Sequence, residues 1–246
     1  MIALLMSLKQ LSAALRTATA FIVVCVAIGS LTAQQFDESP VIQHIDAAVK
    51  ARFDGIESFT VIERYAVFRG NNQTDPVAEM TVKTLYRRDS GKSYTILSES
   101  GPEIVKKIAF GQLLDNEKRI NQPGNREASW FTSANYEMKL KPGGTQQLNG
   151  RNCLALAITP RRKATNLIDG TIWVDARDYS IVQIQGVSSR SPSLFSAPPQ
   201  MMRKYANVSG FAEATHAQAV SNSFLFGKTI VTIDYSNYQI RLRAAR

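Results

Sequence analysis

Apolar residues first recur at helical spacing near the start of the chain's polar part. Four of them form one stripe: Ile42, Ile45, Val49 and Phe53. Ser39 is suited to the N-cap position, Pro40 to the first helical position, and Gly55 to the end of a helix. The pattern therefore predicts an amphipathic helix over residues 40–54 that packs its apolar stripe on a sheet.

From residue 57 the period of the pattern changes to two. One set of alternating side chains consists of Phe59, Val61, Glu63, Tyr65 and Val67. The turn signals Gly70-Asn71-Asn72 and Asp89-Ser90-Gly91-Lys92 separate this run from two further ones, at 78–86 and 94–97. We predict three long antiparallel strands connected as a meander.

Gly101-Pro102 interrupts the strands, and residues 103–119 return to helical spacing, with Gly111 weakening one continuous helix. Residues 191–200 are rich in Pro and Ser and predict a loop or short helix. Further strands are predicted at 135–140, 151–159, 170–176, 180–187, 203–211, 215–226 and 228–240. The turn signal Pro142-Gly143-Gly144 is expected to separate two of them.

The fold class that follows is mostly β, with about ten strands and few helices. A long antiparallel sheet must curl to hide one face, and closed barrels, sandwiches and half-open barrels all satisfy this requirement. The pattern alone does not choose among them. No repeat or linker divides the chain, so one domain over residues 34–246 is expected.

The first 33 residues have the features of a secretory signal. Lys9 and Arg16 precede an apolar run at 20–28, and small residues end at Ala33. The apolar run is short for a membrane span, which needs about 20 residues. We predict a signal peptide over 1–33 and a periplasmic location, with an uncleaved N-terminal anchor as the alternative.

The composition fits a globular protein, with 44% hydrophobic and 20% charged residues. The formal net charge of +9 suits anionic partners. The tight basic clusters are Arg87-Arg88, Lys106-Lys107 and Arg161-Arg162-Lys163, and no aromatic residues interleave them. Since stacking platforms for bases are missing, we predict no nucleic-acid partner.

Residues that could carry chemistry are sparse. His44 and His216 are the only histidines, and no metal-ligand or nucleophile motif surrounds them, so neither a metal nor another cofactor is predicted. Cys153 lies in an apolar run and is read as a buried, inert thiol. Asp175 and Asp178 flank a turn, where aspartates more commonly bond the local backbone than act as a glycosidase pair. These observations favour binding over catalysis.

The second half of the chain resembles a known family. The residues that carry the resemblance include Asn149-Gly150-Arg151-Asn152-Cys153, Gly170-Thr171-Ile172-Trp173-Val174-Asp175 and Ile233-Asp234-Tyr235-Ser236-Asn237-Tyr238. They look like the outer-membrane lipoprotein-sorting proteins, the family of the LolA and LolB carriers, in a divergent branch. The resemblance spans about residues 40–240 by element order, and is most specific over 135–238.

The resemblance implies an unclosed β half-barrel with a helical lid, which carries acyl chains of lipoproteins or lipids across the periplasm as a monomer. Membrane-bound partner proteins are also implied. The residues expected to line the apolar cavity are Phe59, Leu97, Ile172 and Trp173. Arg64, by its place in the first strand, is a candidate for the arginine that latches the lid of such carriers.

Two other functions remain open from the sequence. A periplasmic sensor of the same fold would bind a signalling partner, and predicts a small or filled cavity with an apolar surface patch. A hydrolase with an unrecognised site predicts polar side chains with perturbed pKa values gathered in a cleft.

Overall fold

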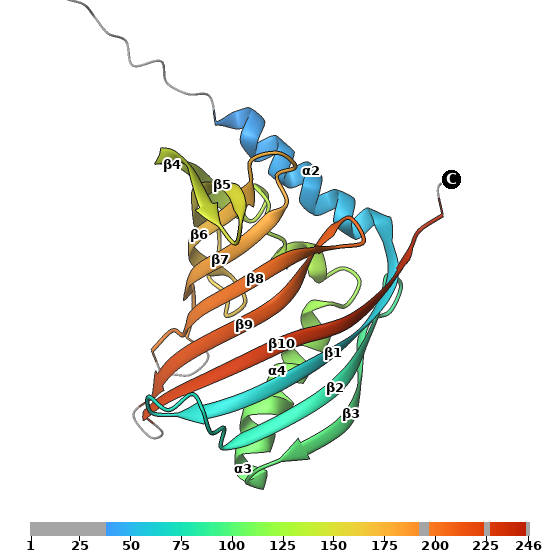
Figure 1. The fold of residues 1–246 in the computed structure, drawn as a ribbon, viewed down its shortest axis with the longest axis vertical. Coiled ribbons are helices and arrows are strands. Elements are labelled where there is room, and N and C mark those ends of the chain that lie inside the picture. The colour runs from blue at the N-terminus through green and yellow to red at the C-terminus, as the bar shows by residue number, and fades with distance from the viewer. Residues whose placement is uncertain (1–37, 192–196, 224–226, 245–246) are drawn as a thin grey trace, which may run out of the picture. The chain divides into compact units, whose positions relative to one another are not determined.

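The computed structural model describes residues 38–191, 197–223 and 227–244. The chain divides into two units, Met1–Asp37 and Glu38–Arg246, and the described residues belong to the second unit. The predicted signal peptide and the centre of the Pro/Ser-rich segment, residues 192–196, lie outside the described residues. Figure 1 shows the arrangement of the elements in the second unit.

One antiparallel sheet dominates the described part of the chain. Its strands run in the order β3-β2-β1-β10-β9-β8-β7-β6-β5-β4, so the first and last strands pair and the sheet ends at β3 and β4. The strands are β1 (Ile56–Arg69), β2 (Ala78–Arg87), β3 (Gly91–Ser100), β4 (Tyr136–Leu148), β5 (Arg151–Pro160), β6 (Ile168–Asp175), β7 (Ile181–Ser188), β8 (Gln200–Val208), β9 (Phe211–Ser223) and β10 (Gly227–Leu242).

The sheet is not closed into a barrel, because β3 and β4 do not pair with each other. The predicted fold class is therefore confirmed, and the half-open alternative holds among those that the pattern left open. The alternation in β1 is also confirmed: Phe59, Val61, Glu63, Tyr65 and Val67 are all buried. Ala66 and Phe68, at alternate positions, form a separate small cluster with Ile230.

Helices lie against the sheet (Figure 1). The described helical elements are α2 (Ser39–Gly55), α3 (Glu103–Val105), the π-helical η1 (Lys106–Gly111), α4 (Gln112–Ile120) and the 3₁₀ turn η2 (Arg126–Ser129). The N-cap of α2 is Glu38 and not Ser39, which corrects the predicted start by one residue. The weakness expected at Gly111 takes the form of a π-helical stretch that ends there.

Two apolar clusters attach the helices to the inner face of the sheet. Val41, Ile45 and Val49 of α2 pack in one cluster with residues of β4–β7. Phe110 of η1 packs in the other with Tyr65 and residues of β2. Because full burial of such a side chain contributes about 1.5–3 kcal/mol, these clusters are the main attachment of the helices.

One predicted turn and one predicted strand are wrong. Pro142-Gly143-Gly144 lies inside β4, where the pairing register with β5 breaks between Leu140 and Thr145. The irregularity absorbs the glycines without ending the strand. Conversely, residues 203–211 are not one strand, because Ser209 and Gly210 form the turn between β8 and β9 with φ of 53° and 89°. Positive φ at both central residues matches the twist of a two-residue hairpin.

Candidate functional site: a cavity beneath the helices

A cavity of about 360 Å³ lies on the inner side of the sheet. Ala48 and Arg52 of α2 form one wall, and Arg126 and residues 129–131, around the end of η2, form another. The inner residues of β1, the β8–β9 turn and Tyr235 and Tyr238 of β10 complete the lining. Pockets for small ligands span about 300–1,000 Å³, so this cavity is at the lower end of that range.

Aromatic side chains supply much of the apolar wall. Phe59 stacks on Tyr86 with ring centroids 4.9 Å apart and contacts Tyr238 at 5.9 Å. Phe53 of α2 stacks on Trp130 at 4.3 Å, which joins α2 to the segment after η2. Stacked rings of this kind contribute beyond their buried area by about 0.5–1.5 kcal/mol per pair.

A two-pronged ion pair fixes α2 beside the cavity. Arg52 Nε donates to Glu213 Oε1 at 2.9 Å, and Nη2 donates to Oε2 at 2.7 Å. The side chain of Glu213 is only 2% exposed, so its charge depends on Arg52 for compensation. The C-terminal end of α2 is held as well, because Arg88 Nη1 donates to the Phe53 carbonyl at 2.6 Å.

The floor of the cavity, on the sheet side, contains the charged residues Glu63 and Lys92 among apolar ones. Glu63 of β1 lines it and is 2% exposed. Its Oε2 accepts a hydrogen bond from the Tyr65 hydroxyl at 2.5 Å, and its Oε1 has no partner among the described residues. Lys92 of β3 pairs with Glu117 of α4 at 2.8 Å, which connects α4 to the edge strand of the sheet.

Burial and neighbouring charges shift the pKa values of four groups at the cavity floor further from 7: Lys92, Glu117, Tyr94 and Tyr235. Burial raises the pKa of Glu117, but the charges of Lys92 and Arg203 outweigh it and lower that pKa to about 2. Burial alone would lower the pKa of Lys92, yet the charges of Glu117 and Glu63 raise it well above its usual value. Burial also raises the pKa of the Tyr94 and Tyr235 hydroxyls. Lys92, Glu117 and both tyrosines therefore keep their ordinary protonation states near pH 7.

Of the residues predicted to line a cavity, only Phe59 lies in this wall. Ile172 is fully buried in the apolar cluster beneath α2. Trp173 is the next residue of the same strand, so its side chain lies on the opposite face of the sheet. There its Nε1 donates to Gln146 Oε1 at 3.1 Å. Leu97 is 54% exposed, at an irregularity in the pairing of edge strand β3.

Arg64 does not line the cavity, as a lid latch would. It is exposed and pairs with Glu79 of the neighbouring strand. Its neighbours in β1, Glu63 and Tyr65, are the buried ones, so the alternation of the strand turns Arg64 away from the cavity. The signal for the charged floor was Glu63, a carboxylate in an otherwise apolar set of alternate residues.

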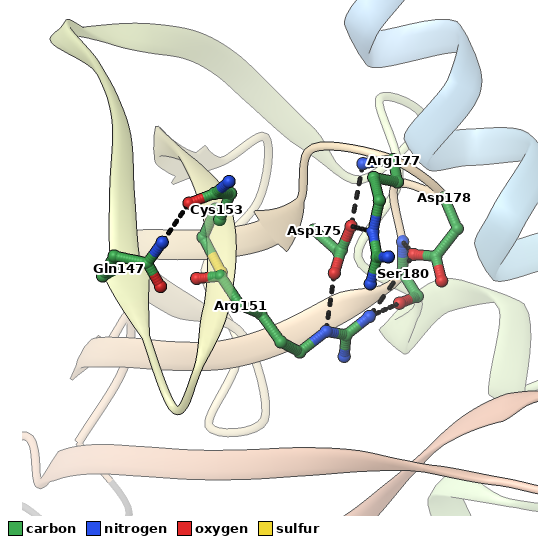
Figure 2. A network of polar contacts seen from close by, with 8 residues as sticks. Gln147, Arg151, Cys153, Asp175, Arg177, Asp178 and Ser180 are labelled. Carbon is green, nitrogen blue, oxygen red and sulfur yellow. Dashed lines mark hydrogen bonds and ion pairs between the residues drawn. The ribbon is translucent and has the colours of Figure 1, made fainter.

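The paired aspartates form a structural network at the β6–β7 turn (Figure 2). Asp175 Oδ2 accepts from Arg151 Nε at 2.6 Å, and Asp175 Oδ1 accepts from the Arg177 backbone amide at 2.8 Å. Asp178 Oδ1 accepts from the Ser180 amide at 2.9 Å. The local bonding predicted for both aspartates is confirmed.

The two histidines and the cysteine lie outside the cavity lining, and the predicted burial of Cys153 is confirmed. Cys153 is fully buried, and burial raises the pKa of its thiol. His44 is exposed on α2 and stacks on Tyr179, while His216 bonds Asp234 at 2.7 Å. Neither histidine lines the cavity. No helix in the described part of the chain is long and apolar enough to cross a membrane.

The described fold thus defines an open antiparallel half-barrel with helices over its inner face. No family model matches the chain, and no curated protein matches it. Among solved structures, it is similar to a LolA superfamily protein from Nitrosomonas europaea, with 13% identity and a TM-score of 0.44, over 82% of this chain and 93% of that one.

Two further solved structures are similar to the chain. An outer membrane lipoprotein-sorting protein domain from Vibrio parahaemolyticus has 14% identity and a TM-score of 0.43, over 80% of this chain and 91% of that one. A DUF1329 family protein from Desulfovibrio piger has 14% identity and a TM-score of 0.42, over 84% and 95%. The first two of the three structures are described by the family name that the sequence resemblance gives.

Proposed function

We propose that the protein is a periplasmic carrier that holds an acyl chain of a lipoprotein or lipid, for sorting to the outer membrane, and catalyses no reaction. The observation that supports this function is the cavity of about 360 Å³ between the helices and the inner face of the sheet. Its aromatic wall and charged floor suit a ligand that has an apolar chain and a polar head.

Desolvation would supply the affinity. Each methylene transferred from water into an apolar environment contributes about 0.8 kcal/mol. Phe59, Trp130 and Phe211 offer the apolar surface. The head would lie toward Glu63, whose unpartnered Oε1 can accept a hydrogen bond from a hydroxyl or amide of the ligand.

Entry of an acyl chain into the cavity would require the helices to move. None of the residues of α4 is fully buried, and its Lys92–Glu117 ion pair joins it to the sheet. Its Leu113 and Leu114 are only partly buried against the second apolar cluster, so α4 would open at a lower free-energy cost than the core strands. Separation of α4 from β3 would widen the cavity, and its return would enclose the ligand.

The absence of catalysis is part of the proposal. A general acid or base works best with a pKa near the operating pH. The pKa of Glu117 is lowered to about 2 and that of Lys92 is raised, so neither exchanges a proton readily near neutrality. Their shifts are those of a structural ion pair.

Native mass spectrometry of the protein as its host produces it, followed by organic extraction, tests the proposal. We expect acyl-bearing molecules at about one per chain, as one cavity of this size requires. A ligand-free protein that also ignores added lipid and lipopeptide would contradict the carrier function.

A partner-binding sensor is the second candidate, and one surface favours it. Ile96 and Leu97 of β3 and Ile104 and Ile108 of α3–η1 are exposed large apolar residues. The Lys106–Glu99 pair, at 3.1 Å, brings η1 and the end of β3 together. If no lipid binds and substitution of Leu97 and Ile104 by serine abolishes capture of a periplasmic partner, the sensor becomes the better account.

A further inference from the structure

A second concave site lies outside the cavity, and all of its charged lining residues are basic. It has a volume of about 370 Å³. Four cationic residues line it: Arg119 at the end of α4, Arg162 and Lys163 between β5 and β6, and Arg190 after β7. No acidic residue is in its lining. The basic cluster at 161–163, which no part of the carrier function uses, supplies two of the four.

The charges of this pocket are uncompensated. Within the described ranges, none of the four cations has a carboxylate within the 4.0 Å of an ion pair. Like charges within a Debye length of about 8 Å repel one another at physiological ionic strength. An anion in the pocket would remove that repulsion, whereas a cation or an apolar group would not.

Neutral partners hold two of the cations in place. Arg162 donates from Nη2 to the Ala128 carbonyl, and Arg119 donates from Nη2 to Asn116 Oδ1 at 2.6 Å. Asn125, also in the lining, donates to the Arg119 carbonyl at 3.2 Å. Because the Ala128 carbonyl and Asn116 carry no charge, they orient the two guanidinium groups without neutralising them, while Asn125 holds the backbone of Arg119.

We propose that this pocket binds a phosphate ester. One guanidinium group can donate two parallel hydrogen bonds to two oxygens of a phosphate. A phosphate carries up to two negative charges and several strong hydrogen-bond acceptors. The ester is either a soluble phosphate compound or the head group of a phospholipid. The pocket does not share its lining residues with the cavity, so this proposal stands whether or not the protein carries acyl chains.

The test compares two double variants with the same change of charge. Lys163→Glu with Arg190→Glu reverses two exposed pocket cations, and Lys83→Glu with Arg87→Glu reverses two exposed cations of β2. Binding of sn-glycerol 3-phosphate is measured by calorimetry. Binding to phosphatidylcholine vesicles with and without phosphatidic acid is measured by sedimentation. Thermal unfolding of each variant confirms that it folds.

We expect the pocket variant to weaken phosphate binding at least tenfold and the β2 variant to change it less than twofold. Binding in the calorimeter alone identifies a soluble ester, and binding to phosphatidic acid vesicles identifies a head group. Absence of binding in both assays would overturn the proposal. Equal weakening by the two variants would overturn it as well, because net charge would then explain the binding.

Discussion

Gly170 of β6 and Gly186 of β7 are directly opposite each other on neighbouring paired strands. A Cβ atom on Gly170 would lie 2.2 Å from the Gln185 carbonyl oxygen, and one on Gly186 would lie 2.2 Å from that of Asp169. Both clashes are with backbone, which cannot rotate out of the way. The close approach of these strands therefore requires glycine on both sides.

We predict that Gly170→Ala lowers the free energy of unfolding by about 1–3 kcal/mol, the usual cost of overpacking. Gly111→Ala is the matched control, because no atom lies within 4 Å of a Cβ there and the backbone is helical. It should leave stability unchanged or raise it by up to about 1 kcal/mol. Urea denaturation measures both, and an equal effect of the two substitutions would refute the argument.

The sequence predicted the role of single residues where the cause is local. The bonding of Asp175 and Asp178 follows from their positions at a turn, and the burial of Cys153 follows from its apolar neighbours. The cavity floor could not be predicted in the same way. Lys92 and Glu117 meet near Glu63 from β3, α4 and β1, and no spacing along the chain encodes that meeting.

At the scale of elements, α2 depends on Arg52. Replacement by methionine would leave Glu213 charged, buried and without its partner. We predict a loss of about 3–5 kcal/mol, as for other broken buried pairs. Arg177→Met is the control, since Arg177 is 87% exposed and its pair should contribute no more than about 1 kcal/mol. If chemical denaturation gave similar losses for both variants, the buried Arg52–Glu213 pair would contribute no more to stability than an exposed pair, which would contradict the prediction.

The α4 ion pair predicts a dependence of stability on pH. The pKa of Glu117 falls from 4.5 to about 2 on folding, so its contribution is present above pH 4.5 and is lost as the pH falls toward 2. The raised pKa of Lys92 confines its loss to alkaline pH. The difference in unfolding free energy between wild type and Glu117→Gln should therefore shrink between pH 4.5 and 2. A difference that stays constant over this range would contradict the assignment.

Most elements were predictable because their apolar periods are long and regular. The strands over 56–69 and 78–87 lie within two residues of their predicted ends. Elements with glycine inside them were less predictable. Pro142-Gly143-Gly144 has the composition of a turn, yet the pairing with β5 carries the strand through it.

At the scale of the whole molecule, the pairing of β1 with β10 decides the architecture. It joins residues as far apart as Ile56 and Leu242, and leaves β3 and β4 as the edges. The segment from α3 to η2 lies between these two strands along the chain, and η1 packs on the inner face of the sheet. Periodicity does not specify such distant pairing, which is why sandwiches and closed barrels remained open from the sequence.

The most direct test of the carrier function is to fill the cavity from α2. Ala48 lines the cavity, whereas its neighbour Ala47 is exposed and does not. Wild type, Ala48→Phe and Ala47→Phe are each incubated with the same lipopeptide and examined by native mass spectrometry. We predict about one bound molecule per chain for wild type and Ala47→Phe, and a large loss for Ala48→Phe, whose ring would take the place of the acyl chain. Equal binding by the two variants would show that any lipid binds elsewhere, and would contradict the assignment of the cavity as the carrier site.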